Sequence, residues 1–325
     1  MTRAAGIVLV LLAVLAAVAA PAIAPHAMDA RSPDLLNAPP TVPHVVGDDG
    51  AWHAPFIYPW RLVSQLEQRY EEDRSRRVPL VWWSGGRVVS SSDESSAPLL
   101  LAGADSFGRD VLARLLFGAR TSLALAAAAA LGALVVGSLV GGLAGYAGGT
   151  ADEVLMRATD FVMVLPAMYV ALALRSVLPL VLTAAQVFWL LAGIFAILGA
   201  PFIARGVRSI VRTERRSDYA VAAEALGASA ARLLVRHLLP AARGFVGVQI
   251  TLMVPSFILA EATLSYVGLG FPDTVASWGS MLHEASTNIR VFSDFPWLLS
   301  PAAAMFLVVL GLNLAFHRDD IQSLR

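Results

Sequence analysis

The chain has 325 residues, of which 57% are hydrophobic and 15% are charged, with 24 acidic and 24 basic side chains and a formal net charge of zero. In a soluble domain about a quarter of the residues are charged, so this composition predicts a protein with much of its surface in contact with lipid. The chain has no cysteine, which excludes disulfides and thiolate metal sites. Every basic residue is arginine, so a Walker-type phosphate lysine and Schiff-base chemistry are excluded, and the balanced charge gives no reason to expect nucleic-acid binding.

Six membrane-spanning helices are predicted from uncharged stretches of about 20 residues. They lie at residues 4–24, 121–150, 161–174, within 176–204, and at 244–271 and 296–316. The third stretch is short, and we expect Asp160 and Arg175 at its two membrane interfaces. The fourth also has to hold a turn around Pro179. The predicted fold is therefore an all-α membrane protein.

The first span, within residues 1–24, also fits a secretory signal, because Arg3 precedes the apolar run and Ala22-Ile23-Ala24 resembles a cleavage site. We favour an uncleaved helix, since its uncharged run is longer than the usual signal core. Both interpretations leave residue 25 onward outside the cell membrane.

The arginine distribution predicts the orientation of the spans. Eight arginines fall between residues 204 and 243, whereas the short loops on the opposite side carry Arg175 and Arg290. Because arginine and lysine collect on the cytoplasmic side, the N-terminus and the C-terminal tail (317–325) are both predicted to be cytoplasmic.

The external segment, residues 25–104, differs in kind from the rest. The stretches 51–60 and 78–89 are predicted as short strands or apolar loop anchors, and the charged stretch 62–77 as a polar helix with i,i+4 opposite charges. A small lobe packed on the membrane domain and a plain spacer loop both remain open. In the entrance segment that follows, residues 105–120, Asp105, Arg109 and Asp110 are candidates to organise the entrance, although as surface ion pairs they are expected to carry little energetic weight.

The cytoplasmic loop, residues 205–243, carries the clearest pattern outside the spans. Ser217 or Asp218 can cap a helix, Gly227 interrupts it, and a second helix is predicted to end at Pro240. Small and apolar side chains on the first helix, at Ala222, Ala223 and Leu226, permit close approach by a groove of another protein. An amphipathic loop lying on the bilayer fits the pattern equally well.

This loop resembles the EAA loop of bacterial ABC importer permeases, whose pattern is E-A-A-x3-G-x9-I-x-L-P. Ala222, Ala223, Gly227, Leu239 and Pro240 stand at the matching positions. The glutamate of the pattern is replaced by Val221 and its isoleucine by His237.

Two further segments narrow the resemblance. Residues 103–123, GADSFGRDVLARLLFGARTSL, are similar to the G-T-D-x-x-G-R-D-V-L stretch before the second helix of dipeptide and oligopeptide permeases, with Ala104 where threonine is usual. Residues 258–282, ILAEATLSYVGLGFPDTVASWGSML, are similar to the I-L-x-E-A-x-L-S-F-L-G-L-G…S-W-G-x-M-L passage of the same family. The chain is thereby identified as a member of the C-type subunits of this family, although the ending FHRDDIQSLR departs from the family pattern.

The resemblance implies a type I ABC importer transmembrane domain at residues 121–316, in the inner membrane of a bacterium. It implies a heterodimer with a second permease subunit, two ATPase subunits that hold the ATP and Mg, and an external solute-binding protein, with no cofactor or metal on this chain. Coupling to the ATPase is assigned to Asp218, Tyr219, Ala222, Ala223, Glu224, Gly227, Leu239 and Pro240. Glu261, the one carboxylate well inside a span, lies on the translocation path or has a structural role.

Other classes of protein remain as alternatives. An ion-coupled secondary transporter uses buried carboxylates or broken helices at mid-membrane, and here only Glu261 qualifies. A membrane enzyme needs a nucleophile with its base or a metal cluster, whereas the six histidines are scattered outside the span centres. A receptor or scaffold would make the loop match a coincidence, and an ABC permease for nickel or another small solute would share the same scaffold.

Overall fold

The computed structural model describes residues 2–48, 50–177, 182–272 and 274–316, so the expected turn around Pro179 and the tail 317–325 lie outside the described residues. The chain divides into two compact units. We call the first the helical unit, made of Met1–Gly6, Leu123–Leu264 and Leu312–Arg325, and the second the mixed unit, made of Ile7–Ser122 and Ser265–Gly311. Each unit is described by itself.

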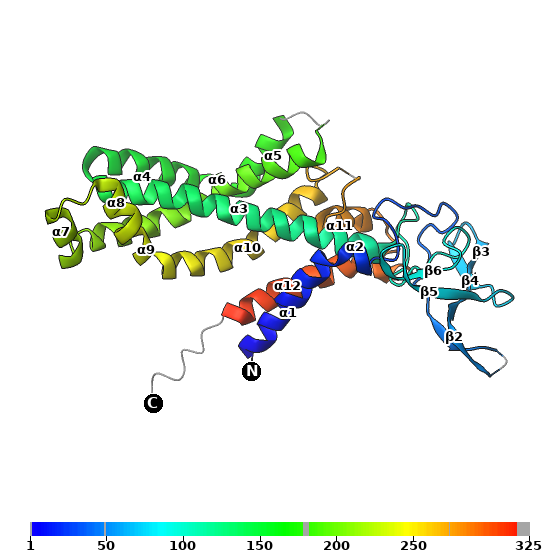
Figure 1. Ribbon diagram of the computed structural model, residues 1–325. Helices are drawn as coiled ribbons and strands as arrows, with labels where there is room; N and C mark the ends of the chain where they lie inside the picture. Colours follow the sequence, from blue (N-terminus) through cyan, green and yellow to red (C-terminus); the bar gives the residue numbers. More distant parts are fainter. Residues whose placement is uncertain (1, 49, 178–181, 273, 317–325) are drawn as a thin grey trace. The chain divides into compact units, whose positions relative to one another are not determined.

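Long helices account for most of the described residues (Figure 1). They are α1 (Thr2–Val18), α2 (Ala20–Ile23), α3 (Val111–Ala147), α4 (Gly149–Val164), α5 (Ala167–Val177), α6 (Ala184–Glu214), α7 (Asp218–Ala225), α8 (Ala230–Leu233), the π-helical segment η1 (Leu234–Leu238), α9 (Leu239–Ala241), α10 (Arg243–Tyr266), α11 (Trp278–Ser286), the 3-10 segment η2 (Pro296–Leu299) and α12 (Ser300–Phe316).

Four helices among the described residues are long and apolar enough to cross a membrane: α3, α6, α10 and Pro296–Phe316. The pair α4 and α5 makes a fifth candidate, and α1 is a shorter apolar helix. The protein is therefore a mostly helical, multi-pass membrane protein, and the count of six remains a prediction.

The third predicted span is not one straight helix, because α4 and α5 meet at an angle of 87°. The break lies at Leu165, which is extended (φ −70°, ψ 133°), just before Pro166. A proline ring disfavours the helical conformation of the residue before it and has no N–H to donate, so the Leu165-Pro166 pair accounts for the break.

A row of glycines brings α3 against α6 inside the helical unit. The glycines lie one turn apart on α3, and each faces the backbone of α6 at positions with the same spacing. A Cβ on Gly137 would lie 2.6 Å from the carbonyl oxygen of Ala200, one on Gly145 would lie 2.6 Å from that of Arg208, and one on Gly141 would overlap the carbonyl of Ala204. Small residues of this kind let membrane helices approach closely, so the row fixes the packing of these two spans.

The segment 25–104 folds as a small β-lobe in the mixed unit, with strands β1 (His44–Val46), β2 (Trp52–Ile57), β3 (Trp60–Ser64), β4 (Arg69–Glu72), β5 (Val78–Ser84) and β6 (Arg87–Ser91). An antiparallel sheet has the order β1-β2-β5-β6, and β3 pairs with β4. The strands expected at 51–60 and 78–89 are confirmed, and Gly85 and Gly86, both at positive φ, form the tight turn between β5 and β6.

The polar helix predicted at 62–77 is wrong, because β3 and β4 occupy this stretch as a hairpin. Two tertiary contacts explain the difference: Trp60 and Tyr70 pack against a buried cluster around Leu35 and Leu100, and the Tyr70 hydroxyl donates to the Leu36 carbonyl at 2.7 Å. Burial, together with the charge of Asp34, raises the pKa of Tyr70 to about 12. Exposed i,i+4 charge pairs are worth only about 0.2–0.5 kcal/mol each and do not outweigh such packing.

The lobe has its own apolar core, so a plain spacer loop is the wrong interpretation. One buried cluster joins Ile57, Val78, Ala97 and Leu99. A second joins Leu35, Ala38, Leu100 and Ala104, the last of which directly precedes the entrance segment. These residues come from both ends of the segment, and their burial ties it into one folded body.

The entrance segment holds a buried charge network rather than the surface ion pairs expected from the sequence. Asp105, Arg109 and Arg114 are each 3% exposed. Arg109 donates to Asp105 Oδ2 at 2.6 Å and to Glu284 of α11 at 2.5 Å. Glu284 Oε1 also accepts from the backbone N–H of Ser106, at 3.1 Å. Because buried charges need partners, this network fixes the entrance segment against α11.

Two segments that carry the family resemblance meet here, within the mixed unit. Trp278, at the start of α11, donates its ring N–H to the carbonyl of Leu115 at 3.1 Å and its backbone N–H to the hydroxyl of Ser122 at 3.1 Å. On the other side of the entrance segment, His26 bonds to Asp110 at 3.0 Å. The first turns of α3 are therefore held by partners distant in sequence.

Candidate functional site: an exposed short helix and an apolar pocket

The coupling residues predicted from the sequence mostly lie on α7 and the turn after it. Ser217 is the N-cap of α7, and Ala220 is its one buried side chain. The remaining side chains of the helix are exposed or half-buried. Among the apolar ones, the side chain of Val221 is 55% exposed, and that of Leu226, directly after the helix, is 90% exposed. We call Tyr219, Val221 and Leu226 the exposed apolar residues of α7; Tyr219 and Leu226 lie on one side of the helix and Val221 lies on the other. Exposed apolar side chains gathered on a short helix are typical of a docking surface.

Gly227 ends α7 in a defined geometry. Its φ is +85°, a conformation that glycine adopts without strain. The N–H of Gly227 donates to the Glu224 carbonyl at 2.9 Å, and that of Ala228 donates to the Ala223 carbonyl at 3.0 Å. These two bonds form a Schellman motif, which closes the helix and directs the chain into α8.

Polar contacts tie α7 to the ends of the long helices. The Tyr219 hydroxyl donates to Glu214 at 2.7 Å, and burial together with this bond raises the pKa of Tyr219. Arg215 donates to the carbonyl of Tyr146 at the end of α3 and lies 4.3 Å from the centre of its ring. Direct contacts therefore join α7 to the end of α6, and the end of α6 to the end of α3.

Carboxylates of α4 hold the arginines of α6 near the same end. Asp152 accepts two hydrogen bonds from the guanidinium of Arg208, one of them at 2.6 Å, and lies 3.5 Å from Arg212. Asp160, which was expected at a membrane interface, accepts a hydrogen bond from the Nε of Arg205 at 3.1 Å. These paired groups brace α4 against α6, and bidentate arginine–carboxylate pairs are among the stronger ones.

The second half of the loop departs from the sequence expectation, because Pro240 does not end the helix. The chain continues from α8 through η1 and α9 to Ala241. Within the widened turn the N–H of Leu239 donates to the Leu234 carbonyl, five residues back. Since proline has no N–H, the π-helical turn before it keeps the helix intact across a position where an α-helical hydrogen bond is missing. Leu234 and Leu239 both lie against Gly142 of α3.

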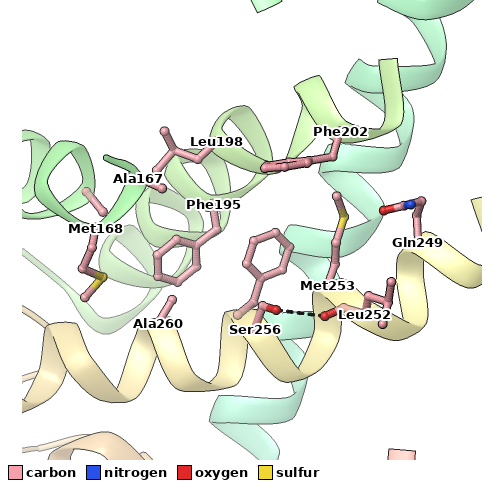
Figure 2. A pocket seen from close by; sticks show the side chains of 13 residues that line it. Ala167, Met168, Phe195, Leu198, Phe202, Gln249, Leu252, Met253, Ser256 and Ala260 are labelled. Carbon is pink, nitrogen blue, oxygen red and sulfur yellow. Dashed lines mark hydrogen bonds between the residues drawn. The ribbon is translucent and has the colours of Figure 1, made fainter. Parts of the chain in front are cut away.

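An apolar pocket of about 410 Å³ lies between α5, α6 and α10, and sequence reasoning did not find it (Figure 2). It is lined by Ala167, Met168, Ala171, Phe195, Leu198, Gly199, Phe202, Gln249, Leu252, Met253, Ser256, Phe257 and Ala260. Phe195 and Phe257 stack with ring centres 5.6 Å apart. The Ser256 hydroxyl turns back to the Leu252 carbonyl at 2.9 Å, as drawn in Figure 2, so Gln249 is the lining side chain with polar groups left to offer a ligand.

Glu261, predicted on the path or in a structural role, is 1% exposed on α10. It follows Ala260, which lines the pocket, but is not itself among the lining residues. Glu261 takes part in an interaction of its own. The carboxylate of Glu261 is therefore next in sequence to a lining residue but does not line the pocket itself.

Apolar helices in this number, with an exposed short helix between two of them, define a multi-pass membrane protein. Residues 133–318 match the family described as binding-protein-dependent transport system inner membrane component, and the chain belongs to that family.

The chain is similar to the oligopeptide transport system permease protein OppC of Bacillus subtilis (strain 168), with 37% identity over 218 residues, covering 65% of this chain and 67% of the relative. It is 35% identical over 225 residues to OppC of Lactococcus lactis subsp. cremoris (strain SK11), covering 68% of this chain and 74% of the relative. A putative peptide permease protein of Brucella ovis is 36% identical over 212 residues, covering 65% of this chain and 68% of the relative.

Proposed function

We propose that this chain is the membrane-spanning permease subunit of an ATP-driven importer for peptides, which an external binding protein delivers. The observation that carries the proposal is the short helix α7 with its exposed apolar residues, which lies between two long apolar helices and is closed by the Schellman turn at Gly227. The similarity to permeases that are named for oligopeptide transport supports peptides as the cargo.

In this proposal the chain crosses the inner membrane of a bacterium six times, with α1 as the first span and the bent pair α4 and α5 as the third. Both termini are cytoplasmic, the β-lobe lies outside, and α7 faces the cytoplasm. The excess of arginine between residues 204 and 243 supports this orientation.

The partners are a second permease subunit, which makes a heterodimer with this chain, and two ATPase subunits that bind ATP and Mg. The short helix α7 docks into a groove of one ATPase subunit, which covers its exposed apolar residues. When the ATPase subunits close on ATP, α7 moves as a rigid element, and its contacts through Glu214 and Arg215 carry the motion to α6 and α3. The permease pair then alternates between an outward-facing and an inward-facing packing.

The pocket between α5, α6 and α10 is the part of the cargo path that this chain contributes. Its walls are apolar and carry few polar groups, so they accept peptide side chains of different shape without a fixed hydrogen-bonding pattern.

The test places a charge at one of the exposed apolar residues of α7. The variant Leu226→Glu introduces a carboxylate at a side chain that is 90% exposed, and Leu66→Glu makes the same change in the β3–β4 turn, where the leucine is 95% exposed. We expect Leu226→Glu to lose the ATPase subunits during purification and to lose transport, because a charge in a closed apolar groove has no partner. Leu66→Glu should retain both. Equal retention of the ATPase by both variants would contradict the docking of α7.

A further inference from the structure

Arg175 is a buried cation for which the described part of the chain supplies no hydrogen-bond partner at two of its nitrogen atoms, and it lies on the helix that forms one wall of the pocket. It is 4% exposed in the last turn of α5. Among the residues that the structure describes, its Nε and Nη1 atoms are buried and have no hydrogen-bond partner. Buried charges are retained where a partner is present for at least part of the working cycle, so this guanidinium points to an anionic ligand.

Arg175 is not itself among the lining residues of the pocket, but it lies one turn beyond them on α5. Ala167 and Ala171 line the pocket, and Arg175 follows at the same spacing of four residues, so the three lie in one row on the helix. Ala171 and Arg175 are also the two buried side chains of α5. Side chains on a helix lean toward its N-terminus, which carries the guanidinium back toward Ala171 and the pocket.

The helices around the pocket offer this guanidinium little of the opposite charge. α5 packs on α6, and α6 has no acidic residue between Thr183 and Ala204. Its buried side chains in that part include Val187 and Leu191, which are apolar. The carboxylate of α10, Glu261, takes part in an interaction of its own. The lining residues of the pocket carry no charge.

We propose that Arg175 binds the C-terminal carboxylate of the peptide as it enters the pocket, an inference that rests on the proposed import of peptides. Every peptide with a free C-terminus carries this carboxylate whatever its side chains are. The planar guanidinium binds a carboxylate through two parallel hydrogen bonds, which a lysine cannot reproduce. A fixed guanidinium beside apolar walls therefore recognises the common end of the cargo, while the walls accept its variable side chains.

The experiment measures uptake by the complete importer in proteoliposomes: both permease subunits, the ATPase subunits and the external binding protein. Two cargoes are compared, a peptide with a free C-terminus and the same peptide as its C-terminal amide, each at a concentration that saturates the binding protein. For the wild-type chain we expect uptake of the free acid to exceed that of the amide by about 10- to 100-fold, the range that one charged hydrogen-bonded pair gives.

Arg175→Gln and Arg175→Met should bring the two rates to within a few-fold of each other, and Arg175→Lys should retain part of the preference. The matched control is Arg157→Gln, an arginine of α4 whose side chain is 77% exposed, which should leave the ratio unchanged. Arg175→Met keeps the volume and removes a buried charge, so its melting temperature should equal or exceed that of the wild type. The melting temperature reports a loss of folding, and the ratio of the two uptake rates reports a loss of carboxylate preference, so the two effects can be distinguished.

Three results would overturn the assignment. The first result is that peptide is transported but the wild type shows no preference for the free acid, or Arg175→Gln shows the same preference as the wild type. The second result is that the effect of Arg175→Gln on uptake depends on the phosphatidylglycerol content of the phosphatidylcholine vesicles and is the same for both cargoes. This result would assign the guanidinium to a lipid phosphate. The third result is that the Arg175 variants do not assemble with the second permease subunit. This result would assign the guanidinium to a carboxylate of that subunit. If the wild type assembles and hydrolyses ATP but takes up neither peptide, the proposed import of peptides itself fails, and the inference falls with it.

Discussion

The glycine row of α3 gives the sharpest test of the packing in the helical unit. In the variant Gly141→Ala the new methyl group would overlap the carbonyl of Ala204 on α6. A carbonyl of a helix backbone cannot rotate away, and carbon–oxygen contacts run at about 3.3–3.6 Å, so α3 and α6 have to separate by on the order of 1 Å. Overpacking of this kind costs about 1–3 kcal/mol.

Gly193→Ala on α6 is the matched control, because no atom lies within 4 Å of the position that its methyl group would take. Alanine is favoured over glycine inside a helix by roughly 0.5–1 kcal/mol, so this variant should be as stable as the wild type or slightly more stable. The free energies of unfolding of the two variants should therefore differ by about 1–3 kcal/mol, which corresponds to several degrees in melting temperature. The assay is thermal unfolding of the purified protein in detergent. Equal melting temperatures for Gly141→Ala and Gly193→Ala would refute the close contact.

Two further predictions concern the turn after α7 and the buried charges of the mixed unit. Gly227→Pro should abolish peptide uptake and the stimulation of ATPase activity while the protein still inserts into membranes, because proline holds φ near −65° and the turn needs +85°; normal uptake by this variant would contradict the role of the turn. Burial, with the charge of Asp105, raises the pKa of Glu284 above its ordinary value of 4.5. A raised carboxyl pKa means that the folded state holds the proton more tightly, so this group's contribution to stability is largest at low pH and is lost as the pH rises through the raised pKa. Melting temperatures measured from pH 4.5 upward should show this decline in the wild type and a weaker one in Glu284→Gln, and identical pH profiles would contradict it.

The sequence predicted the apolar helices and the exposed helix after Ser217, because both depend on local signals. Uncharged runs report membrane helices by composition alone, and the spacing from Ala222 to Gly227 reports a short helix and its stop. The break between α4 and α5 was not predicted, although the Leu165-Pro166 pair inside the predicted third span is a local signal for it.

The features that escaped prediction depend on contacts between distant residues. Arg109 and Glu284 are separated by 175 positions, and no local pattern reports that they meet. The hairpin of β3 and β4 replaced a predicted helix because the packing of Tyr70 outweighs weak charge pairs along the chain. The pocket needs three helices, and none of its lining residues, such as Phe195 or Met253, differs from ordinary residues of a membrane span.

The central claim is that ATP hydrolysis on partner subunits drives peptide uptake through this chain. The most direct measurement is the uptake of a labelled peptide into proteoliposomes that contain this chain, the second permease subunit and the ATPase subunits, with the binding protein outside and ATP inside. We predict uptake that requires both ATP and the binding protein and that is lost in Leu226→Glu but kept in Leu66→Glu. Uptake by the chain alone, driven by a proton gradient without an ATPase, would contradict the account.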